Sequence, residues 1–305
     1  MQKNEFRSGF VTIIGRPNVG KSTFLNKVVG KKVAIMSDKP QTTRNKILGV
    51  VNAKNYQIAF TDTPGIHKAN SELDRRMVNA SYGSVSGVDA VIFMTTPTKK
   101  ILPGDEIIMN NLKKTKIPVF LVINKVDQLK RFNDIDLTLA LYQNLYPFQG
   151  FFPISVLENK NIDHLLDAIY DILPKGPKFY PDDMISDHDN KFLISEMIRE
   201  KILYLTKEEV PHSIAVTVDL LKDNEEDKTV KDVYATIYVE RDSQKQIIIG
   251  KNGSLIKHVK DLAKSDIKKL LGTRVNLDLW VKVKKDWKDR PGDLAYLGYS
   301  QDKFE

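Results

Sequence analysis

The sequence predicts an α/β fold in two parts, a domain of alternating strands and helices followed by a smaller α+β domain. Two observations lead to this prediction. Apolar runs typical of buried strands alternate with helical stretches over residues 10–154. A second series of strand-like and helical segments follows residues 174–191, which are rich in proline and acidic side chains. The length of 305 residues suits two domains.

The composition excludes several classes of protein. Hydrophobic residues make up 41% and charged residues 28%, an ordinary globular mixture. Cysteine is absent, which excludes a disulfide framework, a thiolate zinc site and a cysteine nucleophile, and fits a cytosolic setting. No apolar run is long enough to cross a bilayer, and the first residues have too short an apolar stretch for a signal peptide.

The positive charge is concentrated in one window. The chain has 47 Lys and Arg against 39 Asp and Glu. Residues 241–290 hold 14 of the basic and 6 of the acidic side chains, so the rest of the chain is balanced. This concentration indicates a polyanionic partner at that segment. The alternative is a solvated, lysine-rich helix face.

A glycine-rich segment follows the apolar run at 10–14. It reads Gly-x-x-x-x-Gly-Lys-Ser between a strand and a helical stretch, the context in which this pattern binds phosphate. Its backbone amides can surround phosphate oxygens, and the next helix points its positive end at them. We expect Lys21 to reach the β- and γ-phosphates and Ser22 to bind Mg²⁺. The predicted site comprises Gly15, Arg16, Pro17, Asn18, Val19, Gly20, Lys21, Ser22 and Thr23.

A second motif, Asp62-Thr63-Pro64-Gly65, ends the strand predicted over residues 56–61. Its carboxylate can hold Mg²⁺ through water, and the Gly65 amide can sense a γ-phosphate. Between the two motifs lies Gln41-Thr42-Thr43-Arg44. A threonine there can add a hydroxyl to Mg²⁺; Thr43 is favoured and Thr42 is the alternative, so Ser22, Thr43 and Asp62 form the predicted metal site. An exposed β-turn is the other interpretation of this segment.

A third motif indicates the base. The strand predicted over residues 117–123 ends in Asn124-Lys125-Val126-Asp127. The Asp127 carboxylate can accept hydrogen bonds from N1 and N2 of guanine, a donor pair that adenine lacks. We expect Asn124 to tie this loop to the phosphate loop and Lys125 to lie along the base. A last strand, 151–154, leads to Ser155 and Val156, whose backbone amides can reach guanine O6.

In this order, and at the carboxyl ends of strands, these motifs resemble those of the translation-factor-related GTPases over about residues 8–173. The resemblance implies a P-loop three-layer α/β sandwich in which water attacks the γ-phosphorus, with Lys21, Thr43 and Gly65 in catalytic positions. Ile66 stands where many GTPases have a water-orienting Gln, which predicts slow turnover or a water held by backbone groups. In similar GTPases an Asn at the place of Asn18 helps to bind K⁺; loop capping is the alternative.

The second part of the sequence predicts an RNA-binding domain. A helical stretch at 192–206 is followed by strands at 214–221 and 233–239, then by Gly250-Lys251-Asn252-Gly253 between two helical stretches, then by a strand at 274–283. With the IIIGKNG run and the local charge, this order resembles a type II KH domain, which clamps single-stranded RNA. The resemblance implies RNA contacts from Ile248, Ile249, Gly250, Lys251, Asn252, Gly253 and Lys257. The aromatic and basic tail, 284–303, extends this surface or covers a sheet edge.

A GTPase domain joined to a KH domain resembles the Era family of ribosome-assembly GTPases over nearly the whole chain. The boundaries implied are a GTPase domain at 1–173, a linker at 174–191 and a KH domain at 192–305. The family role is GTP-driven assembly of the small (30S) ribosomal subunit through the 3′ end of 16S rRNA, near an AUCACCUCC-like stretch. The resemblance further implies Mg²⁺ as cofactor, no DNA partner, a cytoplasmic monomer and peripheral membrane association. The Ser-Val start of the last guanine motif departs from the usual Ser-Ala.

Nucleotide and RNA binding are expected to be linked, because ordering of the switch loops by GTP and Mg²⁺ would change the packing, and so the RNA affinity, of the second domain. Three alternatives remain. An RNA-binding scaffold would retain nucleotide without hydrolysis. A related GTPase of transfer-RNA modification or membrane traffic would lack the glycine loop between two helices, and the transfer-RNA-modifying kind would also need a catalytic cysteine. An ATPase should fail at the guanine motif.

Overall fold

A computed structural model of the chain describes residues 5–37, 39, 42–65, 71–129, 133–207 and 210–299. The chain divides into two compact units. The first unit comprises Met1–Ala34, Thr43–Ala69 and Met77–Asp187, and the second comprises Ile35–Thr42, Asn70–Arg76 and His188–Glu305. Two short segments that the sequence places in the first domain, 35–42 and 70–76, therefore belong to the second unit.

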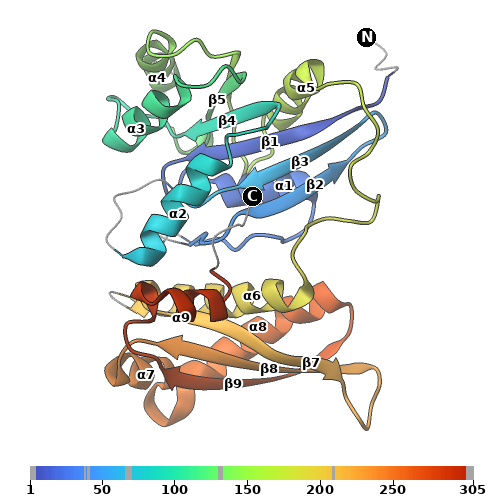
Figure 1. The fold of residues 1–305 in the computed structure, drawn as a ribbon, viewed down its shortest axis with the longest axis vertical. Coiled ribbons are helices and arrows are strands. Elements are labelled where there is room, and N and C mark those ends of the chain that lie inside the picture. The colour runs from blue at the N-terminus through green and yellow to red at the C-terminus, as the bar shows by residue number, and fades with distance from the viewer. Residues whose placement is uncertain are drawn as a thin grey trace. The chain divides into compact units, whose positions relative to one another are not determined.

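The first unit is built on a six-stranded sheet, counted over the described residues (Figure 1). The strand order is β2-β3-β1-β4-β5-β6, with β2 antiparallel to β3 and the other neighbours parallel. The strands are β1 (Arg7–Gly15), β2 (Ile47–Asn52), β3 (Tyr56–Asp62), β4 (Ala90–Thr95), β5 (Val119–Ile123) and β6 (Gly150–Pro153). The predicted strands are present as β1, β3, β4, β5 and β6, whereas β2 was not predicted.

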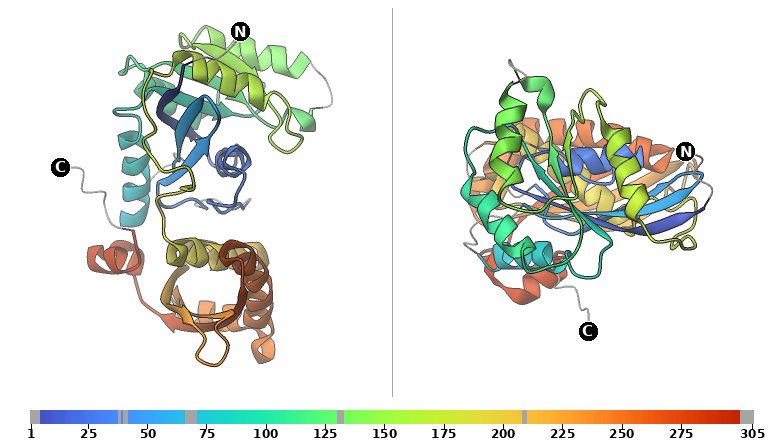
Figure 2. Two further views of the ribbon diagram at one scale, coloured as in Figure 1. Left: turned by 90° about the vertical axis from the view of Figure 1, so that its right-hand side faces the viewer. Right: turned by 90° about the horizontal axis from the view of Figure 1, so that it is seen from above.

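Helices cover both faces of this sheet, as the three-layer prediction requires (Figures 1 and 2). Helices α1 (Lys21–Val29) and α5 (Ile162–Ile172) bury apolar side chains against one face. Helices α3 (Pro103–Leu112) and α4 (Asn133–Gln143) pack against the other, where α2 (Glu72–Gly83) also lies. Because β1, β3, β4 and β5 run parallel to one another, their carboxyl ends meet at one edge of the sheet.

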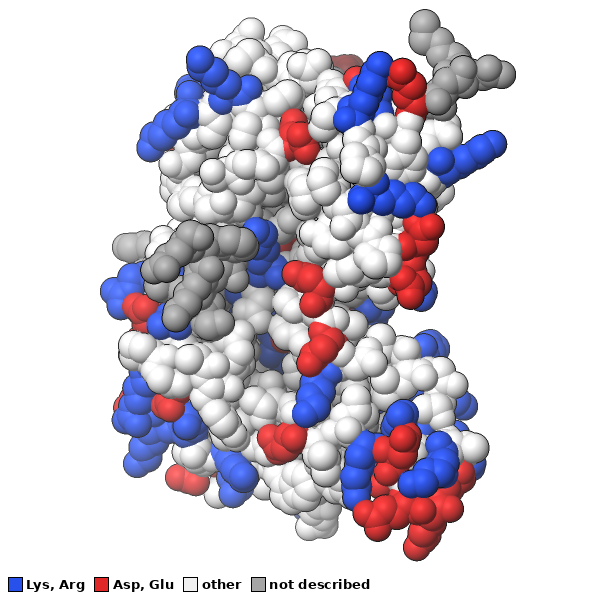
Figure 3. All heavy atoms as spheres, turned by 45° about the vertical axis from the view of Figure 1, so that its right-hand side comes forward, with Lys and Arg blue, Asp and Glu red and all other residues white. Residues whose placement is uncertain are grey.

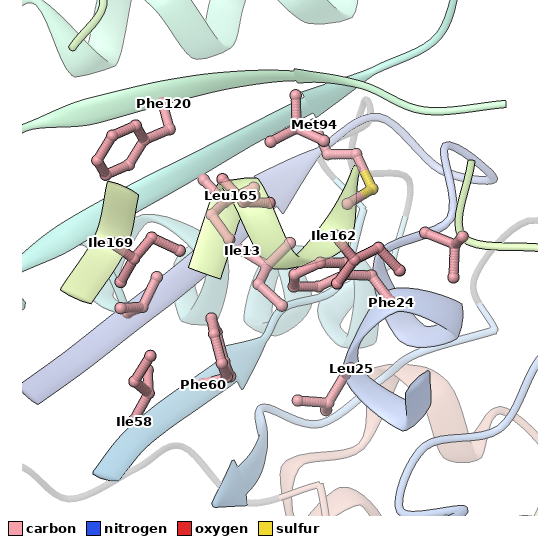
Figure 4. Close-up of a cluster of buried hydrophobic side chains, with 14 of the residues drawn as sticks. Ile13, Phe24, Leu25, Ile58, Phe60, Met94, Phe120, Ile162, Leu165 and Ile169 are labelled. Carbon is pink, nitrogen blue, oxygen red and sulfur yellow. The ribbon is translucent and has the colours of Figure 1, made fainter. Parts of the chain in front are cut away.

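The core on the α1 and α5 side consists of fully or almost fully buried apolar side chains. Figure 4 shows Ile13 and Phe60 of the sheet facing Leu165 and Ile169 of α5, all of them fully buried. Phe24 of α1 meets Phe60 edge to face, with ring centroids 5.8 Å apart. Such packing makes the strand ends a rigid base for the loops that follow them.

The predicted linker is partly bound to the first unit. Residues 174–187 lack helix and strand, as expected, but the side-chain oxygen of Gln57 accepts from the amides of Phe179 and Tyr180 at 2.7 and 2.9 Å. The Val50 amide donates to the Ile185 carbonyl at 3.0 Å. The segment therefore lies against the β2–β3 edge, and the first unit extends to Asp187.

The second unit has a three-stranded sheet within the described range, in the order β7-β8-β9 (Figure 1). Strand β7 (Ala215–Asp223) is antiparallel to β8 (Val230–Val239), and β8 is parallel to β9 (Arg274–Val283). One core joins this sheet to α6 (Asn190–Leu205), α7 (Asp242–Ile249) and α8 (Ser254–Leu271). This order confirms the predicted type II KH arrangement. The tail forms a 3₁₀ turn (Trp287–Asp289) and α9 (Pro291–Tyr296).

Among the residues that the structure describes, no helix is both long and apolar enough to cross a bilayer.

Candidate functional site

The phosphate loop connects β1 to α1 at the carboxyl edge of the sheet. Strand β1 ends at Gly15 and α1 begins at Lys21. Asn18 (φ 63°) and Gly20 (φ 106°) are left-handed, which turns successive backbone amides toward one concave side. A Cβ at Gly15 would lie 2.3 Å from the Met94 carbonyl oxygen, and one at Gly20 would lie 2.2 Å from Nδ2 of Asn124. Both positions therefore require glycine.

Lys21 is buried beneath this loop. Its Nζ donates to the carbonyl oxygens of Gly15 at 3.1 Å and Arg16 at 3.0 Å. Burial lowers the pKa of Lys21 to about 8, and the nearby Asp62 opposes that change. An anionic ligand in the loop would favour the charged form, so the geometry suits the role predicted for this lysine.

Three oxygen-bearing side chains converge beside the loop. The Ser22 hydroxyl donates to Oδ2 of Asp62 at 2.6 Å and lies 2.9 Å from the Thr43 hydroxyl, which is 3.4 Å from the same Oδ2. The other oxygen, Oδ1 of Asp62, is buried and has no hydrogen-bond partner among the described residues. Burial raises the pKa of Asp62, although Lys21 and the two hydroxyls lower it. Hydroxyl and carboxylate oxygens are the donors that Mg²⁺ prefers, and the three residues fit that ion.

The structure distinguishes the two switch threonines. The Thr42 hydroxyl donates to the Lys39 carbonyl at 2.6 Å, away from Asp62, whereas Thr43 is buried beside Ser22. This geometry favours Thr43 as the metal-binding threonine. Gln41 and Ile66 lie outside the described residues.

The second motif approaches the phosphate loop closely. A Cβ at Gly65 would lie 2.7 Å from Cγ of Pro17, so only glycine allows this approach. The Thr63 hydroxyl donates to the Ile13 carbonyl at 2.9 Å, and the Pro64 carbonyl accepts from the Ser81 hydroxyl at 2.7 Å. These bonds fix the backbone immediately before the Gly65 amide.

The guanine motif is tied to the phosphate loop as expected. Nδ2 of Asn124 donates to the Val19 carbonyl at 2.9 Å. Lys125 is left-handed (φ 68°), and Oδ1 of Asp127 accepts from the Ser155 hydroxyl at 2.5 Å. The Ser155 hydroxyl thereby orients the carboxylate that was predicted to read the base.

Three residues of the predicted nucleotide site have partners within the first unit. The Ser155 amide donates to the Lys160 carbonyl at 3.3 Å and the Val156 amide to Oδ1 of Asn124 at 3.1 Å, and their contact with guanine O6 stays a prediction. The Arg16 guanidinium pairs with the buried Asp105 at 2.9 Å, which leaves only its backbone to the phosphate loop. Sequence reasoning missed Asp105, because its partner is distant along the chain.

The glycine loop of the second unit connects α7 to α8. Gly250 (φ 74°), Asn252 (φ 53°) and Gly253 (φ 76°) are left-handed, and a Cβ at Gly250 would lie 2.8 Å from the Leu255 amide nitrogen. Lys251 and Asn252 are exposed. The loop therefore presents backbone and a lysine at the surface, as a clamp for a sugar-phosphate chain requires.

The structure corrects the expected base contacts. Ile248 is fully buried in the core, because it shares the inward face of α7 with Gln244 one turn earlier. Its side chain therefore does not present a surface to bases, while Ile249 is half-buried. Ile247, 50% exposed, is the apolar side chain of this run that reaches the surface. The run of three isoleucines does not itself indicate which of them is buried. Only the four-residue spacing between Gln244 and Ile248 indicates that these two side chains share the inward face of the helix.

The lysines of α8 lie at its surface. Lys257 is exposed and forms no ion pair within the described part of the chain, whereas Lys260 pairs with Asp278 at 2.9 Å. On the face that Figure 3 shows, acidic and basic side chains are mixed over the second unit.

Comparison with protein-family models supports both halves of this description. Residues 10–125 match the family described as 50S ribosome-binding GTPase. Residues 209–288 match the KH domain family.

Three known proteins resemble nearly the whole chain. The GTPase Era of Staphylococcus haemolyticus is 52% identical over 300 residues, which cover 98% of this chain and 99% of the relative. A crystal structure of an Aquifex aeolicus Era variant bound to GDP and aluminium fluoride is 38% identical, with a TM-score of 0.93 over 97% of this chain and 100% of the other. A structure of Era with MgGDPNP and nucleotides 1506–1542 of 16S ribosomal RNA is 39% identical, with a TM-score of 0.94 over 97% of this chain and 99% of the other.

Proposed function

The chain belongs to the Era family of GTPases, and we propose that it acts in assembly of the small (30S) ribosomal subunit. It binds GTP with Mg²⁺ and hydrolyses it to GDP and phosphate in the first unit. The KH domain of the second unit binds the 3′ end of 16S rRNA, the RNA present in the complex of the similar protein. The nucleotide in the first unit sets the affinity of the second unit for this RNA.

GTP hydrolysis depends on how the protein positions the reacting groups and stabilises their charge, because the protein forms no covalent bond with the phosphoryl group. Lys21 and the loop amides stabilise negative charge on the phosphoryl oxygens. Ser22, Thr43 and Asp62 would hold Mg²⁺, which when bound offsets further phosphoryl charge. The Gly65 amide senses the γ-phosphate. The convergence of the hydroxyls of Ser22 and Thr43 on Asp62 is the observation that supports the metal-binding role of these three residues.

One observation supports the coupling of nucleotide to RNA. The Arg199 guanidinium, fully buried on α6, donates to the Thr42 carbonyl oxygen within the second unit. The next residue, Thr43, belongs to the first unit and to the proposed metal site. If Thr43 moves to bind Mg²⁺ and the γ-phosphate, the backbone of Thr42 must move with it. That backbone is hydrogen-bonded to Arg199 of α6, so the movement would be transmitted to α6.

Other bonds hold the same two segments to the rest of the second unit. Oε1 of Glu200 accepts from the Met36 amide at 2.9 Å. In the segment 70–76, the Glu72 amide donates to Oδ1 of Asp289 at 3.0 Å, and Arg76 donates to the Tyr299 carbonyl at 2.8 Å. Residues 35–42 and 70–76 are thus bonded to other parts of the second unit, so that a change in the position of either segment would be transmitted to that unit.

K⁺ is proposed as a further cofactor at Asn18. The left-handed Asn18 lies within the phosphate loop, where a monovalent cation would supply positive charge next to the phosphates. GTP hydrolysis should then be faster in potassium than in sodium at equal ionic strength. An Asn18→Ala variant should lose that difference, and a rate that is equal in both salts would remove this cofactor from the proposal.

The proposed place of action is the cytoplasm, where 30S subunits assemble, with peripheral contact to the cytoplasmic face of the membrane as a secondary location. Fractionation of cells with and without high salt would test this, because a peripheral protein leaves the membrane when its charge contacts are screened.

The central experiment measures the affinity for a 3′-terminal 16S rRNA segment with GDPNP, with GDP and without nucleotide. We expect tightest binding with GDPNP, and faster GTP hydrolysis when the RNA is present, because coupling between the sites is reciprocal. Equal RNA affinity in all three states would rule out the coupling. Stable retention of GTP without hydrolysis, even with K⁺ and RNA, would support a scaffold with a structural nucleotide instead.

A further inference from the structure

A groove in the second unit lies between α8 and β9. Its volume is about 510 Å³. Helix α8 contributes Ile256, Lys257 and Lys260, and β9 contributes Asp278, Leu279 and Trp280. Since α8 starts directly after the glycine loop, the helical wall of the groove begins within one turn of that loop.

Trp280 is the aromatic side chain of this groove. Along β9, Val275 and Leu277 are buried in the core, so the even-numbered residues point to the other side of the strand. Trp280 is 47% exposed. Its ring stacks on Tyr234 of β8, with centroids 5.9 Å apart and planes 18° from parallel. Tyr234 thus supports one part of the indole while another part faces solvent.

The other tryptophan of the second unit, Trp287, has a structural role. Trp287 is fully buried, and its Nε1 donates to the Ser213 carbonyl at 3.2 Å. Trp280 differs in both respects, because no hydrogen bond of its indole nitrogen to any described residue is present and nearly half of it is solvated. Single exposed apolar side chains are common on protein surfaces, and Trp280 differs from them because it lines the groove that begins at the glycine loop.

We propose that Trp280 is a stacking platform for an unpaired nucleobase of the RNA held by the glycine loop. The inference rests on the RNA-binding role proposed above and deepens it. An exposed indole beside lysines is the pair of features with which proteins bind single strands: the ring stacks on a base and the lysine meets phosphate. Lys257 is exposed on the facing wall and has no ion-pair partner in the described ranges.

The acidic groups of the groove are compatible with RNA. Asp278 is paired with Lys260 across the groove at 2.9 Å, which offsets its charge. Asp261 is exposed at the rim. The groove thus holds two lysines and two aspartates. The charge of Asp278 cancels that of Lys260, and the charge of Asp261 cancels that of Lys257, so the net charge of the groove is close to zero. Stacking on Trp280, rather than charge alone, must then supply much of the attraction to the base.

The test uses the full chain and a fluorescein-labelled RNA of sequence AUCACCUCC. Fluorescence anisotropy of the label measures affinity without relying on tryptophan. The Trp280→Ala variant should bind roughly ten- to a hundredfold more weakly, the range expected for loss of one base–aromatic stack. Trp280→Phe should keep most of the affinity, since a phenyl ring also stacks. Tyr204→Ala, which removes a 77% exposed ring of α6 outside the groove, should bind as tightly as the unaltered chain.

Intrinsic fluorescence supplies a readout that a merely structural role would not move. The chain has two tryptophans. Unlabelled RNA should quench the emission of the unaltered chain and leave that of Trp280→Phe, which reports Trp287 alone, unchanged. Unshifted Trp287 emission in Trp280→Ala also shows that the variant is folded.

The possible failures are distinguishable. RNA that binds the unaltered chain without quenching Trp280, and equally well to Trp280→Ala, overturns this inference and leaves the proposed function standing. RNA that does not bind the unaltered chain at all overturns both.

Discussion

The hydroxyl oxygens of Ser22 and Thr43 lie 2.9 Å apart, and both are within hydrogen-bonding distance of one carboxylate oxygen of Asp62. Ser22 is in the first turn of α1, Thr43 precedes β2 and Asp62 ends β3. Three separate elements thus place their oxygens around one point. An ion there would link the segment that contains Thr43 to the phosphate loop. The position of Thr43 would then depend on the bound nucleotide.

The first prediction concerns the two switch threonines. Thr43→Ala should lower the rate of Mg²⁺-dependent GTP hydrolysis by about ten- to a hundredfold, because it removes a hydroxyl that interacts with a charged group. Thr42→Ala should stay within about twofold of the unaltered rate, since its hydroxyl bonds only the Lys39 carbonyl among described partners. Single-turnover hydrolysis across a Mg²⁺ titration measures both. A larger loss from Thr42→Ala would reassign the metal-binding threonine.

Lys21 should make nucleotide binding depend on pH. Burial lowers its pKa to about 8, well under the usual value for lysine, so below that pH the free protein already carries the charge that phosphate needs. Above that pH, Lys21 of the free protein has lost its proton, and GDP binding must be accompanied by uptake of one proton. The affinity for GDP therefore falls as pH rises, by at most about tenfold per pH unit. Calorimetry in two buffers of different ionisation enthalpy should detect most of one proton taken up near pH 8.5 and almost none near pH 6.5. The uptake should vanish in Lys21→Met, and its persistence there would assign it to another group.

Asp127→Asn should change the base that the site accepts. The amide can no longer accept both hydrogen bonds from guanine, so we expect GDP affinity to fall by about a hundredfold or more, while xanthosine diphosphate, with a carbonyl oxygen at C2, gains. Competition binding with the two nucleotides measures the switch. Asp136→Asn, an exposed carboxylate of α4, is the matched control and should leave the preference unchanged. If Asp127→Asn kept its guanine preference, the base would have to be read elsewhere.

Gly20→Ala should abolish nucleotide binding. The new Cβ would lie 2.2 Å from Nδ2 of Asn124, at a φ of +106° that disfavours any side chain, so the substitution both strains the phosphate loop and displaces the guanine motif. Gly30→Ala provides the comparison, because at Gly30 (φ +75°) no atom lies within 4 Å of the place that the added methyl group would occupy. It should cost about 1 kcal/mol of stability and leave GDP binding intact. Thermal unfolding and GDP titration of both variants distinguish the effect of backbone strain, which both share, from the effect of the steric clash with Asn124, which only Gly20→Ala has.

The sequence was sufficient for the parts of the fold that depend on local pattern. The phosphate loop, the Asp62 motif and the Asn124 motif stand at the ends of β1, β3 and β5, as their flanking apolar runs predicted. The glycine loop lies between α7 and α8 for the same reason. Each of these features is encoded within about a dozen neighbouring residues, and special backbone angles at Gly20 and Gly250 require the residue type that the motif contains.

Features that depend on distant partners could not be predicted. Strand β2 exists because it pairs with the edge of β3, and residues 174–187 are held by Gln57 and Val50, far away along the chain. The Val156 amide is bound by Asn124, a partner that the sequence assigned only to the phosphate loop. Nothing local indicated that residues 35–42 belong with α6, since the bond from Arg199 to Thr42 spans 157 positions.

Arg199 should carry the coupling between nucleotide and RNA. Its guanidinium holds the Thr42 carbonyl and pairs with Glu196 at 2.6 Å. Removing the arginine alone would leave a mostly buried carboxylate unpaired and destabilise the unit, so the informative variant combines Arg199→Met with Glu196→Gln. We expect GDP and GDPNP affinities without RNA to remain within about threefold, and the difference in RNA affinity between the two nucleotide states to disappear. Lys191→Met, an exposed cation at the start of the same helix, should retain that difference. A double variant whose RNA affinity still follows the nucleotide would show that the signal passes through another contact, of which Glu72 with Asp289 is the first to examine.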